Sequence, residues 1–171
     1  MFNYILNLFF PKKCIRCKRE GTYLCEDCLS LIELNQINYC ACFKKPVKYR
    51  LRCDNCPRNI KAVFTVLNEK QRLAQKVYYR AKKLAGLNVY FSYLITTYLK
   101  NISFELNSSF TICYESEVKG IAEDLSKFTK LPLNSDLKNV LLLMKKYPNQ
   151  DILKQFENRN VYVISLFREI S

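Results

Sequence analysis

Apolar residues follow no regular period in the first third of the chain and a strong period in the rest, with the change near residues 57–61. In the second part, four short, mostly apolar runs indicate strands, and three of them are rich in β-branched and aromatic residues. These runs are 62–67 (AVFTVL), 110–114 (FTICY), 140–144 (VLLLM) and 161–167 (VYVISLF). The third run is apolar throughout, which indicates a strand that is covered on both faces.

Helical periodicity fills the segments between these strands. The predicted helices span residues 69–84, 88–99, 118–128 and 151–156. In the first of them Leu73, Val77 and Leu84 recur at helical spacing, and the second either continues the first or forms a separate helix. Strands that alternate with helices are typical of a parallel sheet. We therefore predict an α/β fold, with a small parallel sheet over residues 61–171.

Eight of the nine cysteines lie in the first part of the chain, in two groups of four. The first group reads Cys14-x2-Cys17, seven residues, then Cys25-x2-Cys28. A CxxC turn places two thiolates within reach of one ion, and two such turns complete a tetrahedral site. The alternative is a pair of redox-active CxxC motifs, but the βαβ context of such motifs is missing here. The spacing therefore predicts a structural zinc ion.

The second group is less regular, because its first pair has only one residue between the cysteines. It reads Cys40-x-Cys42, ten residues, then Cys53-x2-Cys56. This spacing still permits zinc, and the alternative is a decayed site with weakly bound metal or free thiols. We expect two structural zinc ions per chain and a double zinc ribbon over residues 11–58. Cys113 stands alone in an apolar strand and is interpreted as a core residue.

Composition limits the chemistry that the chain can carry out. It contains no histidine, which excludes histidine general bases and the Ser-His and Cys-His nucleophile pairs. Neither a secretory signal nor a membrane span is expected, since the apolar run 1–10 has no basic region and is too short. We therefore expect a cytoplasmic protein, in which cysteines stay reduced and bind metal.

The charge of the chain favours an anionic partner. It has 28 Lys and Arg residues against 15 acids, a formal net charge of +13. Eight zinc-bound thiolates would subtract 8 and two zinc ions would add 4, which leaves +9. A charge of this size attracts nucleic acid. The alternative explanation is compositional bias, because the chain is also rich in Asn, Ile and Tyr.

Residues 70–83 form a basic segment that concentrates this charge. Its six cations are Lys70, Arg72, Lys76, Arg80, Lys82 and Lys83. Tyr78 and Tyr79 lie among them. Basic residues neutralise phosphates and exposed tyrosines stack on bases, so the segment predicts weak binding to single-stranded nucleic acid. The alternative is a solvated helix face with its tyrosines in the core.

Several motifs together resemble the ComF-type competence protein family. They are an apolar opening (2–10), Pro11, CIRC (14–17), LCEDC (24–28), CDNC (53–56) and the closing strand 160–168. In that family a double zinc ribbon precedes a type I phosphoribosyltransferase-like domain. The resemblance covers almost the whole chain. It implies that the parallel sheet is a small, reduced phosphoribosyltransferase-like domain.

The chain departs from the family at the loop that binds phosphoribosyl pyrophosphate (PRPP). The family has two adjacent acids and a Thr-Thr-Gly turn after a buried strand, whereas the strand 140–144 is followed here by KKYPNQ. The degenerate loop contains Lys145, Lys146, Asn149 and Gln150. The resemblance therefore implies a protein that supports DNA uptake in natural transformation without phosphoribosyl transfer. Its partners would be single-stranded DNA and a competence helicase or another uptake protein. The alternatives are an active phosphoribosyltransferase with an atypical loop and a zinc-ribbon adaptor for protein contacts.

Overall fold

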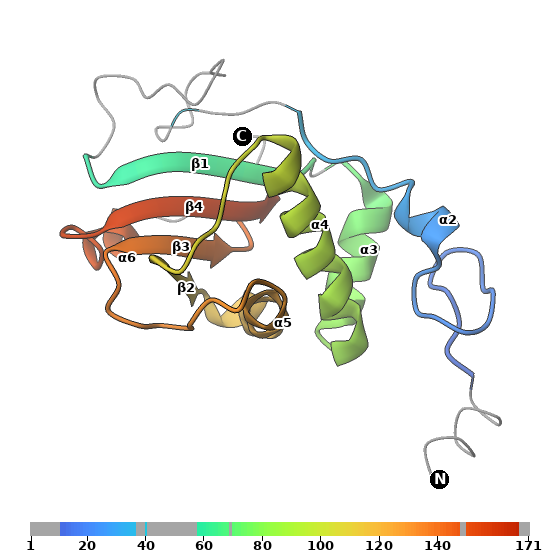
Figure 1. Ribbon diagram of the computed structural model, residues 1–171. Coiled ribbons are helices and arrows are strands. Elements are labelled where there is room, and N and C mark those ends of the chain that lie inside the picture. Colours follow the sequence, from blue (N-terminus) through green and yellow to red (C-terminus); the bar gives the residue numbers. More distant parts are fainter. Residues whose placement is uncertain (1–10, 37–39, 41–57, 69, 148–149, 168–171) are drawn as a thin grey trace, which may run out of the picture.

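The computed structural model describes residues 11–36, 40, 58–68, 70–147 and 150–167 (Figure 1). Its centre is a sheet of four parallel strands in the order β1-β4-β3-β2, so the predicted α/β fold is confirmed. The strands are β1 (Ile60–Leu67), β2 (Phe110–Tyr114), β3 (Asn139–Met144) and β4 (Asn160–Phe167). Each contains one of the predicted strands.

The helices connect the strands as the periodicity predicts, except that the first predicted helix is shorter than expected. They are α2 (Glu26–Leu29), α3 (Arg72–Ala81), α4 (Asn88–Asn101), α5 (Lys119–Thr129) and α6 (Gln150–Lys154), with 3-10 turns η1 (Ala85–Leu87) and η2 (Ser116–Val118). The first predicted helix ends at Ala81, and α4 is a separate helix. Gly86 lies in the turn between them, where a Cβ would lie only 3.3 Å from the ring of Tyr23.

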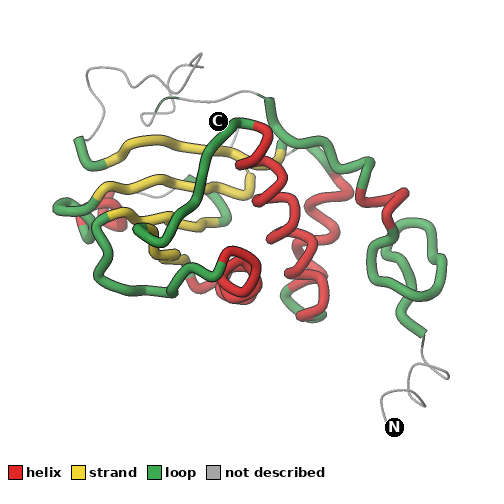
Figure 2. Tube along the Cα trace, viewed as in Figure 1, coloured by secondary structure: helices red, strands yellow, loops and turns green. Residues whose placement is uncertain are grey.

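Both faces of the sheet are buried. On one face Phe64, Leu141 and Ile164 pack in a cluster with residues of α3, α4 and α5. On the other face Leu142 and Val163 pack with Leu153 of α6. Figure 2 shows α3, α4 and α5 grouped beside the ends of the strands, where the arrowheads of Figure 1 point. The apolar sequence of β3 is thus explained by contacts on both of its faces.

The first cysteine group packs on this domain and shares its core. Ile15, Leu24 and Ile32 are buried in the same hydrophobic cluster as α3 and α4. The segment then runs along β1, where Leu34 forms an antiparallel bridge with Leu67. Its position beside α3 is visible in Figure 1. Within the described ranges, no helix is both long enough and apolar enough to cross a lipid bilayer.

Candidate metal centre and nucleic-acid interface

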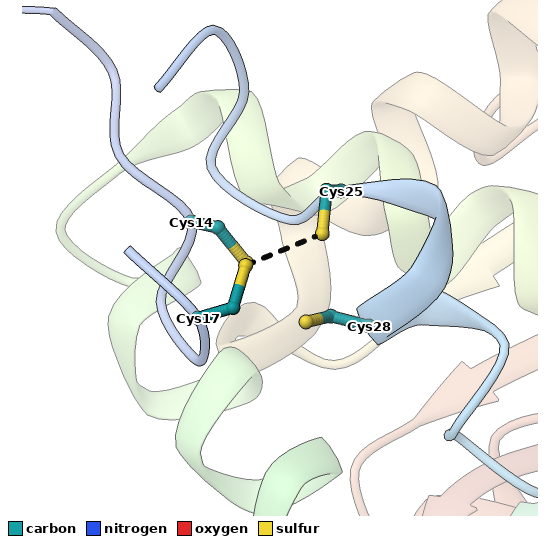
Figure 3. A group of neighbouring side chains, drawn as sticks. All are labelled: Cys14, Cys17, Cys25 and Cys28. Atoms are coloured by element: carbon teal, nitrogen blue, oxygen red, sulfur yellow. Dashed lines mark hydrogen bonds between the residues drawn. The ribbon is translucent and has the colours of Figure 1, made fainter. Parts of the chain in front are cut away.

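Four cysteine side chains converge at one point of the N-terminal segment (Figure 3). The Sγ atoms of Cys14, Cys17, Cys25 and Cys28 all lie within 4.8 Å of one another, and those of Cys17 and Cys25 are 3.5 Å apart. Tetrahedral zinc with bonds of about 2.3 Å places its sulfur ligands about 3.8 Å apart. The cluster can therefore hold one metal ion, with the four ligands that the spacing predicts.

Local backbone geometry produces this convergence. The first pair lies in a turn in which Lys18 N–H donates to Cys14 O at 3.0 Å and Lys18 adopts a φ of 67°. The second pair lies at the start of α2, where Cys28 N–H donates to Cys25 O at 3.0 Å. Gly21, with a φ of 109°, makes the turn between the two pairs possible.

The thiols of Cys14 and Cys28 differ in pKa. Burial raises the pKa of Cys14, but the backbone N–H groups of Cys25, Cys17 and Arg16 donate to its sulfur and lower this pKa to about 6. Burial and hydrogen bonds with the other three thiols raise the pKa of Cys28 to about 12. A set of four thiolates therefore needs a cation among them. Four sulfur ligands would leave a bound ion no open coordination position, which is the arrangement of a structural site and not of a catalytic one.

The second cysteine group lies mostly outside the described residues. Cys42, Cys53 and Cys56 are not described, and Cys40 is buried in the hydrophobic cluster that contains α6. The second zinc ion stays a prediction. Cys113 is buried in β2, as expected of a core residue, and burial raises the pKa of its thiol.

The predicted basic segment forms α3 and its flanks, and the helix has two distinct faces. Ala74, Val77 and Tyr78 face the core. The six cations Lys70, Arg72, Lys76, Arg80, Lys82 and Lys83 are all exposed. The tyrosines divide between the faces, because Tyr78 is 2% exposed and Tyr79 is 57% exposed. The core interpretation therefore applies to Tyr78, and an exposed ring that could stack on a base is found at Tyr79.

Most of this positive charge is not neutralised by the protein. Lys82 Nζ lies 3.5 Å from Glu117 Oε2. The other five cations form no ion pair within the described part of the chain. The segment from residue 70 to residue 83 contains no acid. The exposed face of α3 is thus a basic surface that is available to a polyanion.

Glu117, which lies in the connection after the neighbouring strand β2, holds the loop after β3 through an ion pair. Lys145 Nζ lies 3.2 Å from Glu117 Oε2, and the Lys145 ammonium also lies over the rings of Tyr78 and Tyr79. Lys145 N–H donates to Glu115 Oε2 at 3.4 Å. Lys146 is half-buried, Gln150 begins α6, and Asn149 lies outside the described residues.

Sequence reasoning missed Glu115 and Glu117 as members of this site. A signal for them exists, because both lie within three residues of the end of β2, and the carboxyl ends of parallel strands meet at one edge of the sheet. The hydrogen bond and charge of Lys145 hold the pKa of Glu117 below its ordinary value, against partial burial. The edge therefore carries the ionised carboxylate of Glu117, which Lys145 already engages.

No protein-family model, curated protein or solved structure matches this chain. The resemblance to ComF-type proteins rests on the sequence motifs alone. The parallel α/β sheet and the cysteine cluster are compatible with a zinc ribbon and a phosphoribosyltransferase-like fold.

Proposed function

We propose that this chain is a zinc-containing protein that binds single-stranded nucleic acid through α3 and supports DNA uptake in natural transformation. The observation that carries the binding proposal is the exposed basic face of α3. The role in uptake, and a competence helicase or another uptake protein as partner, follow from the resemblance to ComF-type proteins.

The spacing of the cations suits a phosphate backbone. Arg72, Lys76 and Arg80 recur every four residues, so they stand in a row along one side of the helix. Their charges are not used in ion pairs within the described part of the chain, so binding costs no internal contact. Each phosphate that they neutralise releases counterions, which supplies the free energy of binding.

Tyr79 favours a single strand over a duplex. Its exposed ring is fixed by the edge of Tyr78, with ring centroids 5.7 Å apart, and by the Lys145 ammonium, 5.7 Å from its centroid. A fixed aromatic ring among cations is a platform on which an unpaired base can stack. The bases of a duplex are already stacked on each other and offer no such surface.

Zinc is the metal that we assign to the cysteine cluster, because four thiolates in a tetrahedron are typical of structural zinc. A second zinc ion at Cys40, Cys42, Cys53 and Cys56 belongs to the same proposal. The sheet would act as a scaffold, since Lys145 and Lys146 replace the acids that position PRPP in the family. Engagement of Lys145 by Glu117 supports this interpretation.

The salt dependence of binding tests the proposal. We expect a labelled single-stranded oligonucleotide to bind with a slope of roughly −2 to −3.5 in log affinity against log salt, as three to five phosphate contacts produce. The triple change Arg72→Gln, Lys76→Gln and Arg80→Gln should reduce this slope by about 2, because each lost contact removes about 0.7. Fluorescence anisotropy over a range of salt concentrations measures both values.

A charge-matched variant separates a specific surface from net charge. Lys61→Gln, Lys127→Gln and Lys154→Gln remove the same charge from exposed positions outside α3. We expect this control to keep the slope of the unchanged protein. Equal effects of the two triple variants would contradict a role for α3. Undetectable binding at low salt would favour the adaptor interpretation.

A further inference from the structure

A cavity of 430 Å³ lies where the basic face of α3 ends. Three segments that meet beside the carboxyl end of β2 form its wall. Its polar and glycine residues are Lys82 and Lys83 after α3, Asn88 at the start of α4, and Ser116, Glu117 and Gly120 around the start of α5. Two cations of the basic segment therefore line a cavity at the end of the helix.

The wall of this cavity carries an excess of positive charge. Among the described lining residues Glu117 is the one carboxylate. Its Oε2 lies 3.5 Å from Nζ of Lys82, which lines the cavity, and 3.2 Å from Nζ of Lys145, which lies outside the lining. Two ammonium groups therefore compensate one carboxylate. Lys83 adds a further positive charge and forms no ion pair within the described part of the chain. An anion that enters the cavity meets more positive than negative charge.

The wall also offers neutral donors that the protein leaves unused. The Ser116 hydroxyl and the Asn88 side-chain amide form no hydrogen bond within the described ranges. Gly120 provides the space for this amide, because a Cβ at residue 120 would collide with Asn88 Nδ2. The amino ends of α4 and α5 contribute Asn88 and Gly120 to the same wall, and such ends carry partial positive charge.

We propose that this cavity binds a phosphate monoester at the end of a single-stranded nucleic acid that lies along α3, an inference that rests on the proposed function. A phosphate monoester carries a charge of about −1.5 to −2, whereas an internal phosphate of the strand carries about −1. The excess positive charge therefore selects the strand end. The cavity falls within the range of about 300–1,000 Å³ that is typical of small-molecule sites, which is enough for a terminal nucleotide.

Three labelled oligonucleotides of one sequence test this inference. They carry a 5′-phosphate, a 3′-phosphate, or hydroxyl groups at both ends. We expect one phosphorylated strand to bind about tenfold more tightly than the strand without terminal phosphate, the factor that 1.4 kcal/mol produces. The double change Lys83→Gln and Ser116→Ala should remove most of this difference. Both side chains are exposed, so the variant should keep the fold, which a thermal melt verifies.

Lys76→Gln is the matched control, because it removes one positive charge from α3 outside the cavity. It should weaken binding of all three strands equally. Equal affinities for the three strands would overturn this inference and leave the proposed function standing. Failure of every strand to bind would overturn both. Competition by inorganic phosphate or a nucleoside monophosphate at the affinity of the phosphorylated strand would identify a small-anion site and overturn the assignment to a strand end.

Discussion

At the scale of single residues, Glu117 joins three segments at the edge of the sheet. Its carboxylate pairs with Lys82 after α3 and with Lys145 after β3, and it accepts a hydrogen bond from the Tyr78 hydroxyl at 3.4 Å. Burial, and then the charge of Glu117, raise the pKa of Tyr78 above its ordinary value, so Tyr78 stays a neutral donor. Replacement of this one carboxylate should therefore weaken three contacts.

We expect Glu117→Gln to lower the free energy of unfolding by about 0.5–1 kcal/mol, the upper part of the range for exposed ion pairs. The side chain of Glu117 is 40% exposed, so solvent screening limits the effect. The pKa of Glu117 is lower in the folded protein than its ordinary value of 4.5. Its stabilisation is therefore complete above that value and is lost as the pH falls through the folded-state pKa. Urea unfolding at pH 7 measures the difference.

Glu123→Gln is the control for this change. Glu123 pairs with Lys119 across one turn of α5, at 3.8 Å, and forms no second ion pair within the described part of the chain. Its replacement should cost no more than about 0.3–0.5 kcal/mol. Equal costs for the two variants would contradict a special role for Glu117.

At the scale of elements, the two faces of α3 differ in what they contact. Its buried face packs Tyr78 edge-to-face against Phe91 and Phe167, which ties the helix to α4 and to the end of β4. Its exposed face makes almost no contact that stabilises the fold. Substitutions on the exposed face should therefore change binding while the melting temperature stays nearly constant.

Tyr79→Leu tests the proposal that a base stacks on this face. We expect it to weaken binding of a single-stranded oligonucleotide by about 1–3 kcal/mol, the value of one base stacked on an aromatic ring. The salt slope should not change, because no charge is removed. Tyr93→Leu is a matched control, since Tyr93 is 52% exposed on α4 and lies outside the basic segment. A similar loss of affinity in both variants would contradict stacking on Tyr79.

At the scale of the whole molecule, the cysteine cluster and the sheet are parts of one packed structure. Ile15 lies between two of the metal-site cysteines and is 1% exposed within the core that also holds Phe64 and Ile95. Gln71 Nε2 donates to Glu33 O at 2.7 Å and so joins the start of α3 to the cysteine segment. Loss of metal should therefore affect the sheet as well as the cysteine turns.

Metal removal tests this coupling. Elemental analysis should find one zinc ion per chain if the first group alone is filled and two if the second group also binds. A chelator should lower the melting temperature by at least about 10 °C. In a chain of this size, each kcal/mol lost from the free energy of unfolding lowers the melting temperature by about 2–4 °C. Cys14→Ser should reproduce this loss, while Cys113→Ala should keep the metal content. A folded, reduced sample without metal would contradict the assignment.

The sequence by itself determined the features that depend on short-range patterns. Strands β1, β2 and β4 follow from runs of β-branched and aromatic residues, and β3 and its burial on both faces follow from its wholly apolar run. The first cysteine quartet follows from two CxxC turns seven residues apart, since chain connectivity alone keeps such ligands close. In each case the residues that decide the structure are near neighbours along the chain.

Only the tertiary structure decided which distant residues meet. Tyr78 and Tyr79 are adjacent and chemically identical, and their opposite exposure depends on which side of α3 packs on α4 and β4. The contact between Glu117 and Lys145 exists because β2 and β3 are parallel neighbours whose carboxyl ends share one edge. No local sequence pattern indicates that the cysteine segment and the sheet share one core. Such contacts are set by the packing of whole elements, which a short-range pattern does not encode.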